Sequence, residues 1–315
     1  MKVNFIDSVH PVLSTRLSVA GHTCEDLSER SGDDLLAQLN DSEGLVVRSK
    51  MLDAATLAHA PKLKFIARCG AGMENIDRAW CADHGIRLYS SPEGNRDAVA
   101  EHAVGMLLSV MNHMPRADRE VRGGIWDRIN NSGNELGGKT VGIIGFGQMG
   151  TAFALRLQGF GVKVIAHDKY RNGFSNEQVE EVSLEELQER SDIISLHLPL
   201  TAETDRYADA DFFSMCGKPV WFINTARGPL TDTAALLDAI EAGKVLGACL
   251  DVLEFEERTL LGLKGEMNNP LLQRLFANEN VLLSPHVAGV TKESWFKLSN
   301  VLADKILNDF SPAVS

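Results

Sequence analysis

The sequence lacks the features that mark several classes of protein. It has five cysteines in 315 residues, an odd number spread widely along the chain, and no C-x-x-C pair. Such usage fits reduced thiols in a cytoplasm better than disulfides or a zinc site. The N-terminus lacks the apolar core of a signal peptide, and no apolar run reaches the ~20 residues needed to span a bilayer. No internal repeat, low-complexity tract or G-x-S-x-G nucleophile motif is present.

Positively charged residues are also fewer than negatively charged ones. The chain carries 31 Lys and Arg against 43 Asp and Glu, a net charge of −12. An acidic surface argues against nucleic acid or an anionic membrane as the main partner, although it allows a local basic pocket for an acidic substrate. A length of 315 residues with 44% apolar content predicts a globular protein of two domains.

A glycine-rich turn organises the middle of the chain. An apolar strand, 140–144, leads into Gly145, Gly147 and Gly150, which form a G-x-G-x-x-G before a helix that starts near Thr151. In a dinucleotide site the first glycine permits a tight turn, the second admits the pyrophosphate and the third allows close helix packing. The helix N-terminus adds free N–H groups and a positive dipole end.

The residues after this turn predict the type of cofactor. A second strand, 162–167, ends at Asp168, 23 positions after Gly145 and close to the spacing of a ribose-binding acid. An aspartate here favours NAD, because it would repel a 2′-phosphate. Lys169 and Arg171 nearby weaken that inference.

The first hundred residues alternate between strand and helix patterns, which predicts a parallel sheet flanked by helices. We expect strands at 3–6, 45–47, 63–67 and 87–89 and a helix around 35–39. Two polar turns follow strands, Arg48-Ser49 and 70–72. A cation with free backbone N–H groups at such strand ends suits a carboxylate, whereas the alternative is two ordinary surface turns.

A long helix is predicted from Asp97 to Met111, linking the two units. The following region, 116–134, is charged and rich in turns. It could be an arm that packs on another subunit, but a Trp flanked by glycines, as Trp126 nearly is, more often packs against its own chain.

Four more strands, 192–198, 220–223, 245–250 and 281–283, have polar residues at their ends. Parallel strands bring these ends to one edge of a sheet, beside the cofactor. Reduction of a 2-oxo acid needs a proton donor such as His, a cation for the carboxylate, and a carboxylate that orients the His. Taken singly, each residue has an ordinary structural explanation. The three histidines His167, His197 and His286 follow different strands without a cysteine at ligand spacing, so we expect no metal site.

Seven segments resemble the D-isomer-specific 2-hydroxyacid dehydrogenases, the family of D-3-phosphoglycerate dehydrogenase and hydroxypyruvate/glyoxylate reductase. The resemblance covers nearly the whole chain and is carried by 99–102 (VAEH), Gly124-x-Trp126, 136–145 (LGGKTVGIIG), 197–204 (HLPLTAET), 224–228 (NTARG), 250–252 (LDV) and 284–286 (SPH).

The resemblance implies a role for each matching residue. Arg227 would bind substrate, Glu256 would pair with the histidine, and His286 would be the general acid/base. Residues of the cofactor site would be Gly145, Gly147, Gln148, Met149, Gly150, Asp168, His197, Pro199, Thr225, Ala226 and Asp251. The substrate carboxylate or its neighbour would meet Arg48, Ser49, Ala71 and Gly72.

The family pattern also predicts the architecture, an α/β fold of two doubly wound parallel-sheet domains with a cleft between them. A flavodoxin-like substrate domain would span 1–97, completed by a C-terminal helix in 290–315. A Rossmann NAD-binding domain would span 98–289, with a dimerisation arm near 116–134. Because the sequence ends at Ser315, we expect no regulatory domain after it.

This chain departs from the family pattern at three places. Glu257-Arg258-Thr259 and a longer segment to Pro270 follow Glu256, where relatives have a proline directly or after one acidic residue. Gln148 replaces a frequent arginine, and 230–232 (LTD) replaces the usual Val-Asp/Asn-Glu. The first departure leaves the shape of that loop undetermined by the resemblance.

We therefore predict a cytoplasmic, homodimeric, NAD-dependent D-2-hydroxyacid dehydrogenase. Its substrate would be a small 2-hydroxy or 2-oxo acid, with 3-phosphoglycerate or hydroxypyruvate/glyoxylate the first to test. The alternative is an NAD(H)-sensing interaction protein on the same scaffold, as in corepressors that resemble this family. A third possibility is another NAD enzyme of the superfamily, acting on phosphonate or formate.

Overall fold

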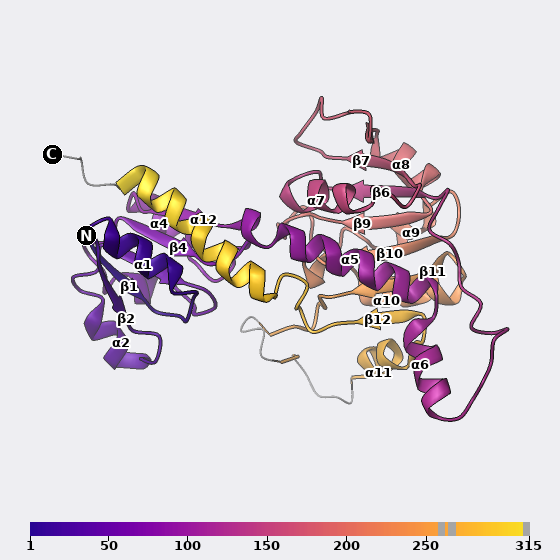
Figure 1. The fold of residues 1–315 in the computed structure, drawn as a ribbon, viewed down its shortest axis with the longest axis horizontal. Helices are drawn as coiled ribbons and strands as arrows, with labels where there is room; N and C mark the ends of the chain where they lie inside the picture. The colour runs from indigo at the N-terminus through magenta and orange to yellow at the C-terminus, as the bar shows by residue number, and fades with distance from the viewer. Residues whose placement is uncertain (258–261, 264–268, 311–315) are drawn as a thin grey trace. The chain divides into compact units, whose positions relative to one another are not determined.

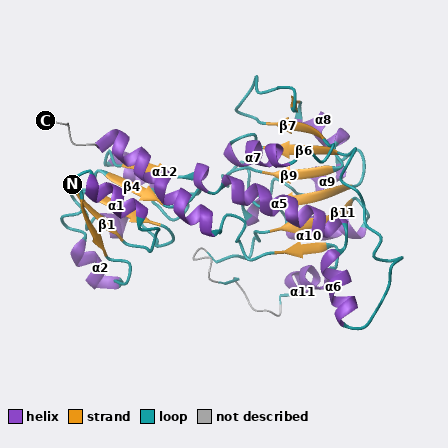
Figure 2. Cartoon of the chain, in the orientation of Figure 1, coloured by secondary structure: helices purple, strands orange, loops and turns teal. Residues whose placement is uncertain are grey.

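The computed structural model describes residues 1–257, 262–263 and 269–310. In it the chain divides into two compact units, Met1–Arg96 with Val290–Ser315 and Asp97–Gly289 (Figure 1). Each has its own parallel sheet, with helices on both faces (Figure 2). The predicted fold class of two doubly wound α/β domains is therefore confirmed.

Unit 1 is built on a five-stranded parallel sheet in the order β2-β1-β3-β4-β5, the flavodoxin-like order. Its strands are β1 (Lys2–Phe5), β2 (Thr23–Asp26), β3 (Gly44–Val47), β4 (Phe65–Arg68) and β5 (Arg87–Ser90). Its helices are α1 (Val12–Val19), α2 (Gly32–Gln38), α3 (Ala54–Leu57), α4 (Arg78–Asp83), η1 (Pro92–Gly94) and α12 (Lys292–Phe310). The last helix returns to this unit, where its buried Leu298, Leu302 and Ile306 pack with α1 on one face of the sheet.

Unit 2 contains a seven-stranded parallel sheet in the order β12-β11-β10-β9-β6-β7-β8, the Rossmann order with one added strand. Its strands are β6 (Thr140–Ile144), β7 (Lys163–His167), β8 (Val179–Glu181), β9 (Ile193–Leu196), β10 (Val220–Asn224), β11 (Val245–Leu250) and β12 (Val281–Leu283). Its helices are α5 (Arg96–Met111), α6 (Met114–Arg122), α7 (Gln148–Arg156), α8 (Leu184–Arg190), α9 (Ala210–Ser214), η2 (Gly228–Leu230), α10 (Thr233–Glu241) and α11 (Pro270–Ala277).

Apolar patterning explains where these elements form. Strands β9 and β10 are buried at every position, as expected for parallel strands covered on both faces. Helices α8, α9 and α10 pack on one face of the unit 2 sheet and α5 and α7 on the other. The predicted helix 97–111 corresponds to α5, whose buried residues include Val99, Ala103, Met106, Leu107 and Val110.

Elements without an apolar pattern escaped the sequence analysis. The short edge strands β2 (TCED) and β8 (VEE) are largely polar. The region 116–134 was expected to be charged and rich in turns, and its first part is instead the end of helix α6, Met114–Arg122. This helix buries none of its side chains. Pro115 lies in its first turn, and pairs such as Asp118 with Arg122 stabilise it along its length.

Candidate active site

The predicted site residues of unit 2 follow the ends of its parallel strands, so they lie along one edge of the sheet. Strand β6 is hydrogen-bonded to β7 on one side and β9 on the other, which makes it the point where the strand order reverses. Ligands of open α/β sheets bind in the crevice outside such a point. The glycine turn begins directly after this strand.

Each of the three positions in the turn favours glycine for a different physical reason. Gly145 has φ 92°, and a Cβ there would lie 2.6 Å from the His197 carbonyl oxygen. A Cβ on Gly150 would lie 2.2 Å from the carbonyl oxygen of Gly145, so the helix can approach the turn only with glycine at this position.

A Cβ on Gly147 would meet nothing within 4 Å, and no side chain caps helix α7, which begins at Gln148 and Met149. The space above Gly147 and the uncapped helix N-terminus fit the pyrophosphate of a dinucleotide.

Asp168 is held firmly at the end of β7. Its Oδ2 accepts a hydrogen bond from the Phe146 N–H at 2.8 Å, and its Oδ1 accepts from the N–H groups of Tyr170 and Arg171, both at 3.0 Å. Three donors fix the carboxylate between the glycine turn and the next loop. This position fits the ribose-binding role that the resemblance implies.

The two cations beside Asp168 already have partners. Lys169 bonds Glu203, and the Arg171 guanidinium donates to the Phe146 carbonyl. Neither is therefore free to hold a 2′-phosphate in this conformation.

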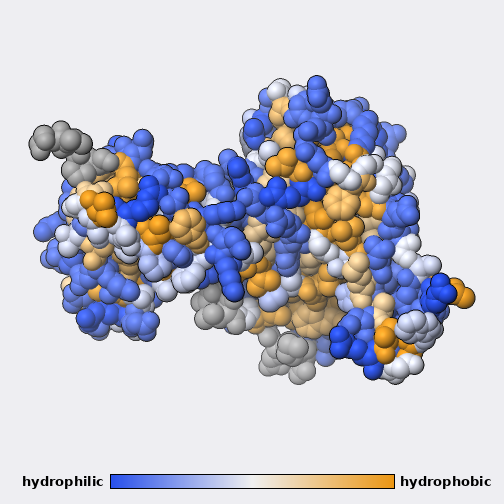
Figure 3. Space-filling model, viewed as in Figure 1, coloured by the Kyte–Doolittle hydropathy of each residue, from blue (hydrophilic) through white to orange (hydrophobic). Residues whose placement is uncertain are grey.

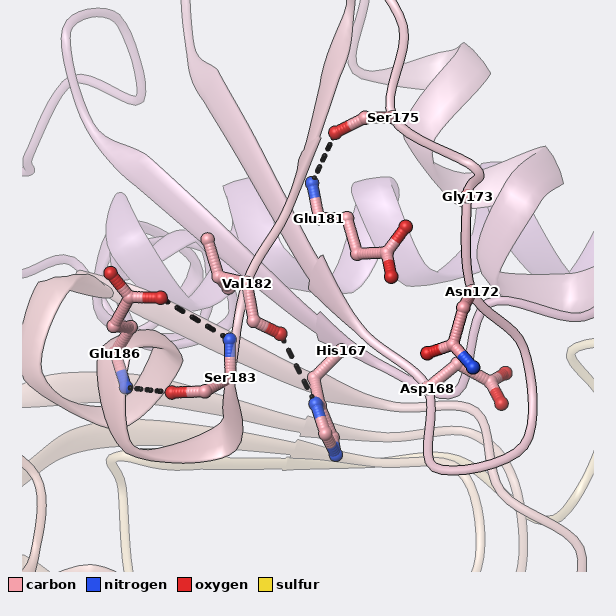
Figure 4. Close-up of a pocket in the computed structure, with 9 residues that line it drawn as sticks. All are labelled: His167, Asp168, Asn172, Gly173, Ser175, Glu181, Val182, Ser183 and Glu186. Carbon is pink, nitrogen blue, oxygen red and sulfur yellow. Dashed lines mark hydrogen bonds between the residues drawn. The ribbon is translucent and has the colours of Figure 1, made fainter.

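A pocket of about 590 Å³ opens beside Asp168 (Figure 4). Glu181 and Glu186 also line it, and the His167 ring is hydrogen-bonded to the Val182 carbonyl at 3.2 Å. The acidic lining gives the pocket the sign of charge that disfavours a phosphate and tolerates an uncharged ribose hydroxyl.

His197 follows β9, and the exposed Pro199 comes two positions later. The His197 Nε2 lies 2.9 Å from the Ser195 hydroxyl, and its ring packs against Phe153 with centroids 5.3 Å apart. Burial lowers the pKa of His197 to about 4. Its imidazole is thus neutral near pH 7, which makes it a poor proton donor and leaves it suited to packing beside a cofactor.

The turn after β10 carries Arg227 and is held by the buried Asn224. The Asn224 side chain donates to the Arg227 carbonyl at 2.9 Å and accepts from the Ala226 N–H at 3.0 Å. The Thr225 hydroxyl is buried and has no hydrogen-bond partner among the described residues. A buried hydroxyl without a partner is costly, so this atom fits a polar group of a bound cofactor.

Glu256 and His286, which are 30 positions apart, are brought together. Glu256 Oε2 lies 2.9 Å from His286 Nδ1, and Glu256 Oε1 accepts from the Leu253 N–H at 2.7 Å. The Arg227 turn packs on the same segment, because a Cβ on Gly228 would lie 2.0 Å from the Leu253 carbonyl oxygen. Leu253 therefore ties the arginine turn to the Glu256–His286 pair.

Asp251 holds the loop that carries His286. Its carboxylate is 1% exposed and accepts from the N–H groups of Val287 and Ala288, each at 2.9 Å. The His286 N–H donates to the Asp251 carbonyl at 2.7 Å, and His286 has a φ of 55°. A non-glycine residue in this left-handed region must be held by its surroundings, and Asp251 does so.

A pocket of about 320 Å³ lies beside the Glu256–His286 pair. Apart from this pair and Ser284 its side-chain lining is apolar, with Leu253, Phe276 and Leu283 among its walls. The predicted departure after Glu256 falls mostly on 258–261 and 264–268, which lie outside the described residues.

In unit 1 the structure corrects one expectation. The N–H groups of Arg48 and Ser49 are not free, because both donate to Asp7 Oδ2 at 2.7 Å, as the Lys50 N–H does at 2.9 Å. Asp7 follows β1, the neighbour of β3, so the end of one strand fixes the loop after the next. The Arg48 side chain is exposed. Ala71 and Gly72 are half-buried, and their N–H groups make no hydrogen bond to the described part of the chain.

Sequence reasoning missed Asp7, the buried Ser195 beside His197, and the packing role of Leu253. Asp7 could have been found, since it is the first polar residue after a buried strand, as Arg48 and Asp168 are. No sequence signal marks Leu253, because its contribution is a backbone contact. Within the described ranges no helix is both long and apolar enough to cross a membrane, and no three His, Cys, Asp or Glu side chains gather to hold a metal ion.

Comparison with known families agrees with this geometry. Residues 104–288 match the family model "D-isomer specific 2-hydroxyacid dehydrogenase, NAD binding domain". The chain belongs to the D-isomer-specific 2-hydroxyacid dehydrogenase family. The matched range contains all the cofactor-site candidates of unit 2, so this dehydrogenase family's NAD-binding domain is the part of the chain that carries them.

Individual members of the family are similar to this chain in sequence and in structure. The D-3-phosphoglycerate dehydrogenase of Mycobacterium tuberculosis is 37% identical over 277 residues, which are 87% of this chain and 50% of the relative. The chain thus spans about half the length of the curated relatives it matches. Among solved structures, a D-lactate dehydrogenase from Treponema pallidum aligns with a TM-score of 0.83 at 28% identity, covering 100% of this chain and 98% of that one. A D-lactate dehydrogenase from Aquifex aeolicus, complexed with NAD and lactic acid, aligns at 0.81 and 28%, covering 98% and 96%.

Proposed function

We propose that this protein is an NAD-dependent dehydrogenase of D-2-hydroxy acids. The observation that carries the proposal is the Glu256–His286 pair at 2.9 Å, held through Leu253 against the turn that bears Arg227. Interconversion of a 2-hydroxy acid and a 2-oxo acid requires a proton carrier and a cation for the carboxylate, and this packing ties the segment of one to the turn that bears the other.

Each side chain has a distinct task in this proposal. His286 Nδ1 is bonded to Glu256, which leaves Nε2 to take the proton of the substrate hydroxyl or return it to the carbonyl oxygen. Glu256 fixes the orientation of the imidazole and stabilises the imidazolium that forms. The Arg227 guanidinium binds the substrate carboxylate and polarises the C2 oxygen. NAD, when bound, would supply the acceptor for the hydride that leaves C2 in the oxidising direction.

The residues that would hold NAD are those of the glycine turn and its neighbours. Gly147 and the N-terminus of α7 would bind the pyrophosphate, Asp168 the adenosine ribose, and Thr225 the nicotinamide side. We assign cofactor binding to unit 2 and propose substrate binding for unit 1, whose exposed Arg48 would read the distal group of the substrate. The name of the M. tuberculosis relative makes 3-phosphoglycerate the first candidate.

The test of the reaction is oxidation of NADH with a panel of 2-oxo acids, phosphohydroxypyruvate, hydroxypyruvate, glyoxylate and pyruvate. A His286→Ala variant should lose at least about 10²-fold in turnover while still binding NADH. His59→Ala, which changes an exposed histidine of unit 1, is the matched control. Turnover retained by the His286 variant would refute its role.

The substrate preference has its own test. If Arg48 reads a phosphate, Arg48→Ala should raise KM for the phosphorylated substrate by about tenfold or more and leave glyoxylate unaffected. Arg30→Ala, an exposed arginine paired with Asp34, is the control. Equal effects on both substrates would remove the phosphate assignment.

The rival function is NAD(H) sensing through a protein partner. It would be supported by tight NADH binding with no turnover on the whole panel, together with NADH-dependent capture of a partner. Oxidation of formate or phosphonate would reduce NAD, so it is tested separately by following NADH formation.

We also propose a homodimer, joined through α6 and the loop that follows. This segment exposes Ile125, Trp126 and Ile129 at 56%, 78% and 85%. Apolar side chains reach the surface around α6 and that loop (Figure 3). An exposed cluster of this kind marks an interaction site, and a second copy would cover it.

Sedimentation velocity tests the dimer. Ile129→Asp should convert the dimer to a monomer, whereas Val19→Asp, at an equally exposed valine of α1, should not. A monomeric wild-type protein at micromolar concentration would refute the proposal.

We also propose a cytoplasmic location for this protein. The five cysteines are all free thiols, which supports a reducing compartment.

A further inference from the structure

His102 lies on α5, and its side chain turns toward the strand-end network behind the candidate active site. Its Nε2 is 3.0 Å from the Ser284 hydroxyl and 3.6 Å from Asp251 Oδ1, and the side chain is 30% exposed. All three residues belong to unit 2. None of the roles assigned above uses His102 or Ser284.

The direction of the hydrogen bonds follows from chemistry. Ser284 Oγ lies 2.5 Å from Asp251 Oδ1, and an ionised carboxylate can only accept, so the single hydroxyl hydrogen of Ser284 points to Asp251. The Ser284 oxygen is then an acceptor, and the donor facing it is the Nε2–H of His102. The other neighbour of Ser284 Oγ is Met106 Sδ at 3.6 Å, a weak acceptor that competes for the hydroxyl hydrogen.

The chain of bonds ends at the loop that carries His286. Asp251 Oδ1 accepts from Ser284 and from the Val287 N–H, and Asp251 Oδ2 accepts from the Ala288 N–H. A donor from His102 keeps the Ser284 hydroxyl turned toward Asp251 and away from Met106. Asp251 thereby keeps a third donor, which stabilises its buried charge.

We propose that His102 is a positioning residue that acts through Ser284 and Asp251 to hold the backbone on which His286 sits. The kinetic part rests on the proposed function, in which His286 carries the proton. The structural part, the hold on the Val287 and Ala288 N–H groups, does not depend on that function.

Two variants separate the donor from the shape of the side chain. His102→Leu fills similar space on α5 but cannot donate, whereas His102→Gln can donate an amide N–H to Ser284. The His102→Leu variant should have a kcat about three- to tenfold lower, the effect of one lost hydrogen bond, with a smaller change in KM. The His102→Gln variant should retain most of the wild-type kcat. Equal activity of the Leu and Gln variants would overturn the donor role.

A double-mutant cycle with Ser284→Ala tests the route. If His102 acts through Ser284, the double variant His102→Leu/Ser284→Ala should be no slower than Ser284→Ala alone. Additive losses in kcat would overturn the proposed route.

Amide hydrogen exchange gives a readout that needs no substrate. In His102→Leu and in Ser284→Ala the Val287 and Ala288 amides should exchange about three- to tenfold faster, while sheet amides of β6 stay unchanged. His59→Leu is the control. If the protein turns over no 2-oxo acid, the proposed function fails while exchange still tests the network. Unchanged exchange at both amides would overturn the inference even in an active enzyme.

Discussion

Asp168 is the residue through which the choice of cofactor is most directly tested. Asp168→Asn keeps the size of the side chain and one oxygen acceptor, but it removes the negative charge. Because Phe146, Tyr170 and Arg171 donate their backbone N–H groups to this carboxylate, the loop should be slightly weakened and not unfolded. The change therefore removes the charge together with one of the two acceptor oxygens.

The magnitude follows from Coulomb's law. Two unit charges about 4 Å apart interact by about 4 kcal/mol at an effective dielectric constant of 20. Asp168 is half-buried, so screening reduces the repulsion of a 2′-phosphate to about 1.5–3 kcal/mol. The kcat/KM of Asp168→Asn for NADPH should thus exceed that of the wild type by about 10- to 150-fold. Its kcat/KM for NADH should fall by about tenfold, because a charge-assisted hydrogen bond to the ribose becomes a neutral one.

The assay is kcat/KM for NADH and for NADPH at one saturating 2-oxo acid, for wild type, Asp168→Asn and Asp211→Asn. The last is an exposed aspartate of α9 and changes the net charge equally. Raising the salt concentration should shrink the wild-type preference for NADH, since screening weakens the repulsion. An unchanged ratio of the two cofactors in Asp168→Asn would refute the reasoning.

Four further predictions concern packing and pH. Gly147→Ala should raise the Kd for NADH at least about tenfold with less than about 1 kcal/mol lost stability, because a Cβ there meets nothing but the cofactor's space. Gly150→Ala should lower the free energy of unfolding by about 2 kcal/mol or more, since its Cβ would overlap a carbonyl oxygen.

Gly228→Ala should lower kcat more than about tenfold by pushing the Arg227 turn off Leu253. Finally, burial lowers the pKa of His197 from 6.5 to about 4, so the folded state binds this proton less readily than the unfolded state does. Its stabilisation is present above pH 6.5 and lost as the pH falls toward 4, by at most about 3 kcal/mol.

Thermal and urea unfolding with and without NADH distinguish these outcomes. Equal stability losses in the Gly147 and Gly150 variants would contradict the contrast between open and packed glycines. A Gly228 variant with normal kcat would show that Leu253 does not position the arginine turn. For His197, the comparison is urea unfolding of wild type and His197→Gln between pH 4 and 7. Parallel pH curves would exclude its contribution.

Much of the fold could be predicted because its signals are local. The apolar runs of β6, β9, β10 and β11 mark strands buried on both faces, and the glycine turn marks the strand-to-helix junction after β6. Local signals failed where an element buries little. Helix α6 buries none of its side chains, and β2 and β8 are largely polar edge strands, so no buried apolar run sets them apart from loops.

By itself the sequence determined the two parallel sheets, the dinucleotide turn and the family, because each depends on residue types at fixed spacing. Only the tertiary structure decided which polar groups meet. Backbone N–H groups of the 48–50 loop are taken by Asp7, and Glu256 reaches His286 across 30 positions. Hydrogen bonds of this kind depend on where chain segments cross in space, which spacing along the chain does not encode.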